Sequence, residues 1–347
     1  MLKNNNISSH NTVEGITHMD DNKLCNTIDE LNDRKNKFPL IAIDGGGTKT
    51  YAVITDKVGK VLIAKKAGSS NYQVAGKQLT IENIKNAINQ AVYNLQTNET
   101  PTFTTGIFAL AGIDTEKDRE IAQDIVKQAI KESRAQIDNT IVENDALSVL
   151  LGATNQHPGA ILIAGTGSIA FAHDGKGNFV RAGGWGHKLG DEGAGFWIGK
   201  EALRAILKSF DGRNPETILM GMVLNHYGLE NHEQLYNWVY GDRFSVHNIG
   251  EIATMVDTAF KKGDIVSKNI LDRAVDELFH LISAVVKRAN ILDKSFKLIM
   301  LGGVLQNNSY VRRELTLKVK ENIPGVIIDN NYLKPIEYII QRGLNST

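Results

Sequence analysis

The stretch LIAIDGGGTKT at residues 40–50 combines groups that suit the binding of a polyphosphate. An apolar run leads into Asp44, the glycines at 45–47, Thr48 and Lys49. Glycines let the backbone turn with positive φ and approach a ligand closely, and the N–H groups of such a turn converge on an anion. Thr48 adds a hydroxyl, Lys49 a positive charge, and Asp44 a hard oxygen ligand for Mg²⁺ or its waters. The alternative is a plain glycine hairpin, because Tyr51 to Thr55 resembles a second strand that returns. The spacings of the two commonest phosphate loops are both missing.

A second stretch, AILIAGTGSIAFA at residues 160–172, repeats the order of apolar strand, glycine-and-hydroxyl turn and returning strand. Thr166 follows Thr48 by 118 residues, and Asp174 follows Asp56 by the same offset. Upstream of the turns the offset is 120 residues, so the two turns differ slightly. A repeat of this kind constrains the fold more than either turn does alone. It predicts a duplicated domain with two hairpins that face phosphates.

Both copies lie in a pattern of strands and helices that is typical of an α/β protein. In the first copy we expect a three-stranded meander and then helix, strand, helix, strand and helix, at residues 40–44, 50–55, 61–66, 79–95, 103–111, 114–133, 140–143 and 146–153. After a boundary at His157-Pro158-Gly159 we expect a second meander, a glycine-rich loop at 183–199 and helical segments at 200–291. A strand at 296–301, a helix from 310, a strand at 326–329 and a last helix from 335 complete the second copy. The helical segments exceed one minimal copy, which predicts a helical insertion in the second domain.

Composition restricts the class of protein and its partners. The 347 residues suffice for two domains, and 42% hydrophobic with 22% charged residues is typical of a globular protein. The formal net charge is 0, so neither nucleic acid nor a membrane is expected as a partner. The single cysteine, Cys25, excludes intrachain disulfides and cysteine-held metal or iron–sulfur clusters in the body. Residues 1–37 are polar, lack a signal-peptide core and are expected to form a disordered leader.

Several short motifs occur in an order that resembles the sugar kinase, Hsp70 and actin superfamily. They are DGGGTKT, Ser69-Ser70-Asn71, END at 143–145, AGTGS at 164–168, GGWGHKLGDEG at 183–193, AxxxGD at 259–264 and LGGV at 301–304. More narrowly, the chain looks like the N-acetylglucosamine kinase branch, grouped with the BadF/BadG-type ATPases. The resemblance implies two ribonuclease-H-like lobes, an actin-like ATPase fold around a cleft. These lobes would span residues 38–156 and 157–334, and a closing helix at 335–347 would pack back towards the first lobe.

The resemblance also implies roles for individual residues, with ATP and Mg²⁺ as cofactors. Asp44 would act on Mg²⁺ through water, and Asp145 matches the base that takes the proton from the attacking hydroxyl. ATP would be bound by Gly45, Gly46, Gly47, Thr48, Lys49, Gly165, Thr166, Gly167, Ser168, Gly302 and Gly303. The N-acetylated sugar would be bound by Asn71, Asp145, Gly184, Trp185, Gly186 and Asp191.

Some of these residues also have purely structural interpretations. Asp145 precedes a helix and would favour its N-terminus whether or not it is the base. Trp185 lies between glycines, where a tryptophan packs poorly as core and is better placed to cover a sugar face. His187 is a lone histidine, a type that is more often structural than catalytic. Tyr338 lies near the position where the closing helix of the family usually has a glycine, which leaves the packing of that helix open.

The leading functional hypothesis is an ATP-dependent kinase of amino-sugar or cell-wall sugar salvage. Its substrate would be the 6-hydroxyl of N-acetylglucosamine or N-acetylmuramic acid, with glucosamine as an alternative. An ATPase that activates a 2-hydroxyacyl-CoA dehydratase is disfavoured, because that role needs cysteines at the lobe interface. A non-catalytic sugar-sensing clamp would keep the phosphate turns without needing Asp145. We expect a cytoplasmic protein and leave its oligomeric state open, with a homodimer as one option.

Overall fold

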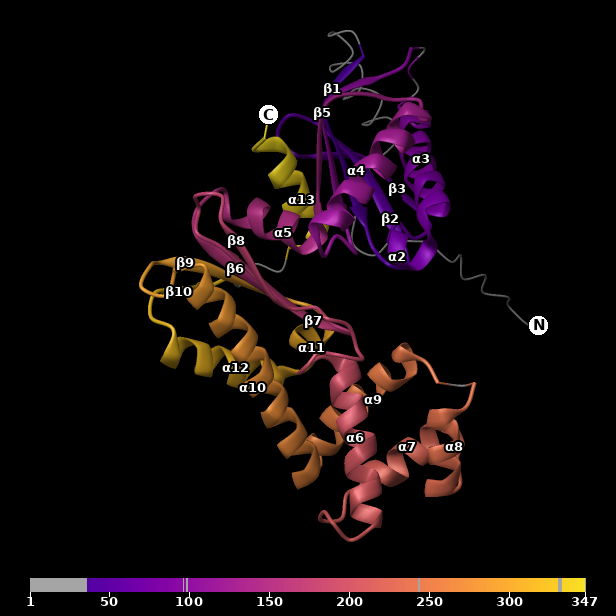
Figure 1. The fold of residues 1–347 in the computed structure, drawn as a ribbon, viewed down its shortest axis with the longest axis vertical. Helices are drawn as coiled ribbons and strands as arrows, with labels where there is room; N and C mark the ends of the chain where they lie inside the picture. Colours follow the sequence, from indigo (N-terminus) through magenta and orange to yellow (C-terminus); the bar gives the residue numbers. More distant parts are fainter. Residues whose placement is uncertain (1–35, 96, 98, 243, 330–332, 347) are drawn as a thin grey trace, which may run out of the picture. The chain divides into compact units, whose positions relative to one another are not determined.

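The computed structural model describes residues 36–95, 97, 99–242, 244–329 and 333–346 (Figure 1). The expected leader therefore lies outside the described residues except at its end, where Lys37 already belongs to the first strand. The chain divides into two compact units, which we describe one at a time. The first consists of Met1–Asp145 and Ile339–Thr347, and the second of Ala146–Tyr338.

The first unit is built on a five-stranded sheet with the order β3-β2-β1-β4-β5. Its strands are β1 (Lys37–Gly45), β2 (Thr50–Thr55), β3 (Val61–Ala67), β4 (Thr102–Leu110) and β5 (Gln136–Asn144). The first three strands pair antiparallel, whereas β1, β4 and β5 run parallel. The central residues 40–43 of β1 are buried on both faces, which explains why they form an uninterrupted apolar run.

Helices cover this sheet. On one face α3 (Lys77–Tyr93) and α4 (Glu116–Lys131) lie side by side and bury their apolar stripes against strand residues such as Ile41 and Phe108 (Figure 1). Helix α4 begins at a capping box in which Thr115 and Asp118 bond reciprocally, so the sequence itself fixes where the helix starts. A one-turn helix, α2 (Tyr72–Ala75), follows β3, between the strand and the helix that the sequence predicts on either side.

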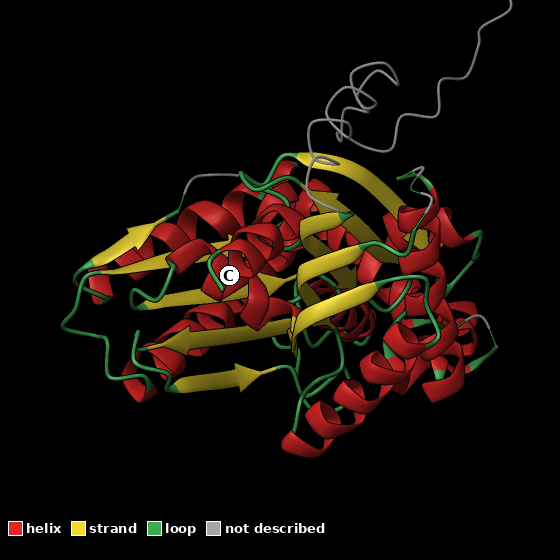
Figure 2. Cartoon of the chain, turned by 90° about the horizontal axis from the view of Figure 1, so that it is seen from above, coloured by secondary structure: helices red, strands yellow, loops and turns green. Residues whose placement is uncertain are grey.

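The second unit repeats this sheet. Its order is β10-β9-β6-β7-β8, with β6 (Gly159–Ala164), β7 (Ser168–His173), β8 (Phe179–Gly183), β9 (Phe296–Leu301) and β10 (Val326–Ile328). As in the first unit, three strands form an antiparallel meander and the remaining two continue it in parallel. The equal order and pairing confirm the duplication that the 118-residue offset predicts. Figure 2 shows the strands of each sheet side by side, with helices packed on them.

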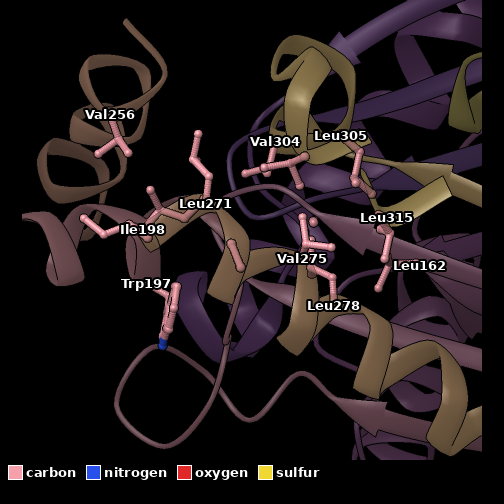
Figure 3. Packing of buried hydrophobic residues seen from close by; sticks show 14 of the residues in the cluster. Leu162, Trp197, Ile198, Val256, Leu271, Val275, Leu278, Val304, Leu305 and Leu315 are labelled. Atoms are coloured by element: carbon pink, nitrogen blue, oxygen red, sulfur yellow. The ribbon is translucent and has the colours of Figure 1, made fainter. Parts of the chain in front are cut away.

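Helix α10 (Ile265–Arg288) packs on the second sheet as α3 packs on the first, and α12 (Ser309–Asn322) packs beside it as α4 does beside α3. The insertion consists of α6 (Gly195–Phe210), α7 (Leu219–Tyr227), α8 (His232–Tyr240) and α9 (Val246–Lys261). Figure 3 shows how side chains such as Ile198, Val256 and Leu271 join the insertion to α10 in one apolar cluster. Within the described residues no helix is both long and apolar enough to cross a membrane.

Two helices contain the points where the chain passes from one unit to the other. Helix α5 (Asp145–Thr154) starts at Asp145, the last residue of the first unit before the chain enters the second. The rest of the helix packs with the second unit. There the Thr154 hydroxyl lies 2.8 Å from His173 Nε2, and Lys297 Nζ donates to the Ala153 carbonyl at 3.0 Å. The division therefore falls after Asp145, earlier than the boundary expected at residue 156. Its cause is side-chain packing, which the His-Pro-Gly signal does not report.

The last helix, α13 (Pro335–Leu344), returns to the first unit from Ile339 onward. Gly343 lies directly against Leu40 and Ile107, since a Cβ there would come within 2.5 Å of a Leu40 methyl carbon. Tyr338, the departure from the family pattern, is buried, and its hydroxyl donates to Asp329 at 3.5 Å. Burial, with the neighbouring Asp329 carboxylate, raises the pKa of Tyr338 to about 12. Tyr338 thus remains neutral and serves as a packed residue of the second unit.

Candidate functional site

The first glycine turn, which is expected to bind phosphate, joins β1 to β2 and is held by hydrogen bonds on both sides. The Gly46 N–H donates to the Lys49 carbonyl at 2.9 Å, which closes the turn. The Gly46 carbonyl accepts from the Ser70 N–H at 3.2 Å and from the Ser69 hydroxyl at 3.3 Å. The segment after β3 therefore supports the turn from below, and this explains why the serines accompany the glycines in the sequence.

The three glycines of this turn do not adopt the backbone conformation that the sequence suggested. None of Gly45, Gly46 and Gly47 has a positive φ, so the expectation of left-handed geometry is wrong here. Space is the reason for glycine instead. A Cβ at Gly45 would lie 2.2 Å from Ser70 Oγ, whereas a Cβ at Gly47 would meet nothing within 4 Å. Gly45 allows close packing inside the protein, and Gly47 leaves an open surface that a ligand can approach.

Two carboxylates lie at the carboxyl edge of the parallel strands beside this turn. In the paired register Asp44 of β1 is level with Ala109 of β4, which is level with Glu143 of β5, and Asp145 follows two residues later as the first residue of α5. Burial first, and then the negative charge of Asp145, raise the pKa of Asp44 to about 6, against the lowering effect of Lys49. The two side chains are thus electrostatically coupled.

This pair fits a magnesium ion better than a metal held by the protein alone. Within the described part of the chain no cluster of three or more His, Cys, Asp or Glu side chains could hold a metal ion. Mg²⁺ keeps several waters and is usually bound through one or two carboxylates together with substrate phosphates. A divalent cation would also relieve the unfavourable burial of the Asp44 charge. The residues present therefore fit Mg²⁺ that arrives with a nucleotide.

The second glycine turn, between β6 and β7, is fixed by the start of α6. The Gly165 N–H donates to the Gly167 carbonyl at 2.9 Å. The first amides of the helix then donate to the turn, Gly195 to the Gly165 carbonyl at 2.8 Å and Phe196 to the Thr166 carbonyl at 3.2 Å. Carbonyl oxygens that would repel an anion are in this way turned toward the helix. Gly165 and Gly167, like the glycines of the first turn, have no positive φ.

A pocket of about 390 Å³ opens beside the second turn and lies entirely within the second unit. It is lined by Gly165 and Thr166 of the turn, Gly195 of α6, Gly303 of α11 (Gly303–Asn307), and His247, Glu251, Thr254 and Asp257 of α9. Gly302 does not line it but has a φ of +101° and lies against the Ala164 backbone, where a Cβ would come within 2.4 Å of the carbonyl oxygen. The structure thus brings Gly165, Thr166 and Gly303 together, and adds a polar face of α9 that the sequence reasoning missed.

Asp191 contacts the second turn directly. The Ser168 N–H donates to its carboxylate at 3.2 Å, and a Cβ at Gly167 would lie within 2.8 Å of the same group. The backbone of Asp191 is left-handed, with a φ of +62°. Burial raises the pKa of Asp191, the Ser168 amide opposes the rise, and the Glu192 charge adds to it. A residue expected to bind sugar is therefore packed against a turn expected to bind phosphate.

The tryptophan loop follows β8 and is exposed. Trp185 is 66% exposed, so it is not a core residue. The Arg181 guanidinium lies 4.8 Å from the centre of its ring and donates to the Gly184 carbonyl at 2.7 Å and the Gly183 carbonyl at 3.1 Å. Arg181 thus supports the loop, a contribution that the sequence pattern did not reveal. Gly184 and Gly186 have backbone φ values of +71° and +80°, a conformation that residues other than glycine rarely adopt.

Asn71 has a structural task in addition to any role with a ligand. It is the N-cap of α2, and its side-chain oxygen accepts from the Gln73 N–H at 3.0 Å. That bond occupies the oxygen and leaves the amide end for another acceptor. Gly112 lies close by, since a Cβ there would approach the Asn71 oxygen to 2.6 Å. Asn71 is thus held in place beside the end of β4, in the same unit as the first turn.

Comparison with known proteins agrees with this arrangement. Over 291 residues the chain is 36% identical to the N-acetylmuramic acid/N-acetylglucosamine kinase of Clostridium acetobutylicum. The aligned region covers 83% of this chain and 92% of the relative. It is 31% identical over 320 residues to the N-acetyl-D-glucosamine kinase of Dictyostelium discoideum, and this alignment covers 90% of the chain and 99% of the relative.

The fold is also that of a solved structure from Chromobacterium violaceum, which is provisionally described as an N-acetylglucosamine kinase. The two structures match with a TM-score of 0.69 at 22% sequence identity, over 88% of this chain and 99% of the other. The profile of a known ATPase family matches residues 41–338, nearly all of the chain that the two sheets and their helices occupy. This chain belongs to the BadF/BadG/BcrA/BcrD ATPase family.

Proposed function

We propose that this chain is an ATP-dependent kinase that transfers a phosphoryl group to the 6-hydroxyl of an N-acetylated amino sugar. The observation that carries the proposal is the coupled pair Asp44 and Asp145 at one strand edge, beside an open phosphate turn. Phosphoryl transfer depends on positioning and charge neutralisation, so a cation-binding carboxylate next to a proton acceptor is the arrangement it requires. The curated relatives, both amino-sugar kinases, support the choice of acceptor.

Each unit has a candidate phosphate-binding turn. Gly45, Gly46, Gly47, Thr48 and Lys49 would receive phosphates in the first unit, and Gly165, Thr166, Gly167 and Ser168 in the second. The pocket of about 390 Å³ has room for a nucleoside, with Gly303 at its wall and Gly302 shaping the approach to it. Its polar face on α9 offers hydrogen-bond partners for a base and ribose.

Asp145 would accept the proton of the sugar hydroxyl as the new bond to phosphorus forms, since a carboxylate within hydrogen-bond reach suffices for this task. As the first residue of α5 it also interacts favourably with the helix N-terminus, so the structural and catalytic interpretations are compatible. Mg²⁺, held by Asp44 through water, would neutralise charge on the phosphates. A kinase of this type depends on intracellular ATP, which favours a cytoplasmic location.

The candidate sugar-binding residues are Asn71 in the first unit and, in the second unit, Gly184, Trp185, Gly186 and Asp191. The exposed Trp185 ring suits contact with a sugar face or an acetyl methyl group. The Asn71 amide suits a sugar or acetyl oxygen. Polar groups arranged for an acetamido group are left unpaired by glucose, at a cost of about 1–3 kcal/mol each. An N-acetyl sugar should therefore be preferred to glucose.

The test is steady-state kcat/KM for N-acetylglucosamine, N-acetylmuramic acid, glucosamine and glucose, with ADP release as the readout. We expect an N-acetylated sugar to exceed glucose by roughly tenfold or more, which follows from one unpaired polar group. Equal values for glucose and N-acetylglucosamine would refute the sugar assignment and the role of Trp185 with it. ADP release that ignores all four sugars would refute the kinase.

A further inference from the structure

A half-buried ion pair ties the last helix of the chain to the strand that leads into Asp145. Arg342 of α13 donates from Nη2 to Glu143 Oε1 at 2.5 Å and from Nε to Glu143 Oε2 at 3.2 Å. Only 24% of the arginine side chain and 14% of the glutamate side chain are exposed. The Nη1 atom of Arg342 donates in addition to the Ser346 hydroxyl at 2.7 Å. Such a two-point contact fixes orientation as well as distance.

The neighbouring residue is anchored on the other side of the sheet. Asn144 is buried, and its Nδ2 donates to the Ile113 carbonyl at 3.3 Å, in the segment after β4. Successive residues of a strand point to opposite faces. Glu143 is therefore fixed toward α13 and Asn144 toward the loop after β4, immediately before Asp145. The three letters of the END motif thus consist of two anchors followed by the carboxylate.

The ion pair also balances charge. Glu143 lies two residues from Asp145, whose negative charge already raises the pKa of Asp44. Arg342 places a positive charge beside this third, half-buried carboxylate at the edge of the sheet. Loss of the two-point contact would free the Glu143 side chain to change its orientation, and with it the end of β5.

Apolar contacts attach α13 to the sheet in addition to the ion pair. Ile339 and Ile340 are buried, Gly343 packs on Leu40, and Leu344 lies against Gly59. These apolar contacts hold the helix on the sheet. Buried ion pairs can often be replaced by apolar residues without loss of stability, so their presence is a weak argument for a purely stabilising role.

We propose that Arg342 is a positioning residue, which sets the place of Asp145 through Glu143. The inference rests on the proposed function, because it concerns the base of that reaction. Arg342 is not one of the residues assigned to either reactant; its effect passes through the Glu143 carboxylate and two residues of backbone. It assigns a task to the closing helix, which carries none of the expected site residues.

The test compares Arg342→Gln with the wild-type enzyme at a temperature well below unfolding. Misplacement of a reacting group by about 1 Å costs about 10²-fold, so we expect kcat to fall by about 10- to 100-fold while KM for ATP and sugar changes by less than about threefold. In the Asp145→Asn background the same substitution should have no further effect, since the group being positioned is already lost. Arg119→Gln, which removes an exposed ion pair with Glu116 on α4, is the matched control and should leave kcat unchanged.

Wild-type kcat in Arg342→Gln, or an equal further loss in the Asp145→Asn background, would overturn the inference. If Arg342→Gln does not fold, Arg342→Lys replaces it, because lysine keeps the charge but lacks the two-point geometry. A reduced kcat in Arg342→Lys supports the role, and an unchanged kcat contradicts it. A wild-type chain without sugar-dependent turnover would refute the proposed function and this inference together, whereas an active wild type beside an unaffected variant refutes this inference alone.

Discussion

The carboxylate of Asp191 accepts a hydrogen bond from the backbone N–H of Ser168 at 3.2 Å. The first residue comes from the loop expected to bind sugar and the second from the turn expected to bind phosphate. Because the two are in direct contact, a change in either one alters the other. The left-handed backbone of Asp191 costs free energy that the surrounding loop must offset, which is common at functional sites.

Gly167→Ala should disturb this contact. The new Cβ would lie within 2.8 Å of the Asp191 carboxylate, which would have to move. We expect kcat/KM for the sugar to fall by roughly tenfold or more, the usual consequence of a displaced positioning group.

Gly47→Ala tests the first turn, because nothing in the chain lies within 4 Å of the added Cβ. It should fold normally but lose nucleotide affinity, as measured by titration calorimetry. Unchanged nucleotide affinity would show that the first turn does not approach phosphates.

Trp185→Ala should separate binding from stability. The ring is 66% exposed, so its loss should change the free energy of unfolding by no more than about 0.5 kcal/mol. An aromatic contact contributes about 0.5–1.5 kcal/mol beyond its area, so KM for the N-acetyl sugar should rise by up to roughly tenfold. Trp185→Phe should recover part of this. A variant with wild-type KM would remove Trp185 from the sugar site.

Asp44→Asn should stabilise the protein in the absence of ligands and metal, and only at higher pH. The folded pKa of Asp44 is about 6 against 3.8 ordinarily, so between these values the folded state binds more protons than the unfolded state. Stability from this group is therefore greatest below pH 4 and is lost as pH rises toward and beyond 6. Asparagine avoids the loss, and at pH 8 the variant should be more stable by roughly 2–3 kcal/mol.

The comparison requires urea unfolding of both proteins in chelator at pH 4 and pH 8. The charge of Asp145 is the second cause of the raised pKa of Asp44. In a protein that keeps Asp44, Asp145→Asn should therefore reduce the difference in the free energy of unfolding between pH 4 and pH 8. A stability gain from Asp44→Asn that is equal at both pH values would contradict the assignment of the shift to a buried charge.

Asp145→Asn should retain both substrates but lose turnover. A positioned base contributes about 10²–10⁴-fold, so kcat should fall by that factor, or about 3–5 kcal/mol of barrier. KM for ATP and sugar should remain within a few-fold of wild type, because the amide occupies the same volume. A variant with nearly wild-type kcat would reduce Asp145 to a residue of the helix N-terminus.

The sequence predicted the elements whose causes are local or repeated. Apolar runs such as 40–43 identified the central strands. The offset between Thr48 and Thr166 predicted a duplicated domain, and the structure has two sheets with the same strand order. Membership of the family and the two-sheet α/β fold are confirmed. The roles assigned to single residues remain predictions.

What the sequence did not reveal depends on contacts between distant segments. The polar face of α9 lines the pocket, but its pattern of Glu251 and Asp257 is that of any amphipathic helix. The stacking of Arg181 on Trp185 has no signature in spacing alone. The glycines of the turns were identified for a positive φ that they do not have, because a need for space and a need for conformational freedom select the same residue.

The central claim is tested most directly by following products with the wild-type enzyme, ATP, Mg²⁺ and N-acetylglucosamine. ADP and sugar phosphate are quantified together, and phosphorus NMR identifies the substituted hydroxyl. The account predicts equimolar ADP and a sugar phosphorylated at the 6-hydroxyl, with no ADP when the amino sugar is omitted. ADP formed at the same rate without any amino sugar, or a phosphoryl group at another position, would contradict it.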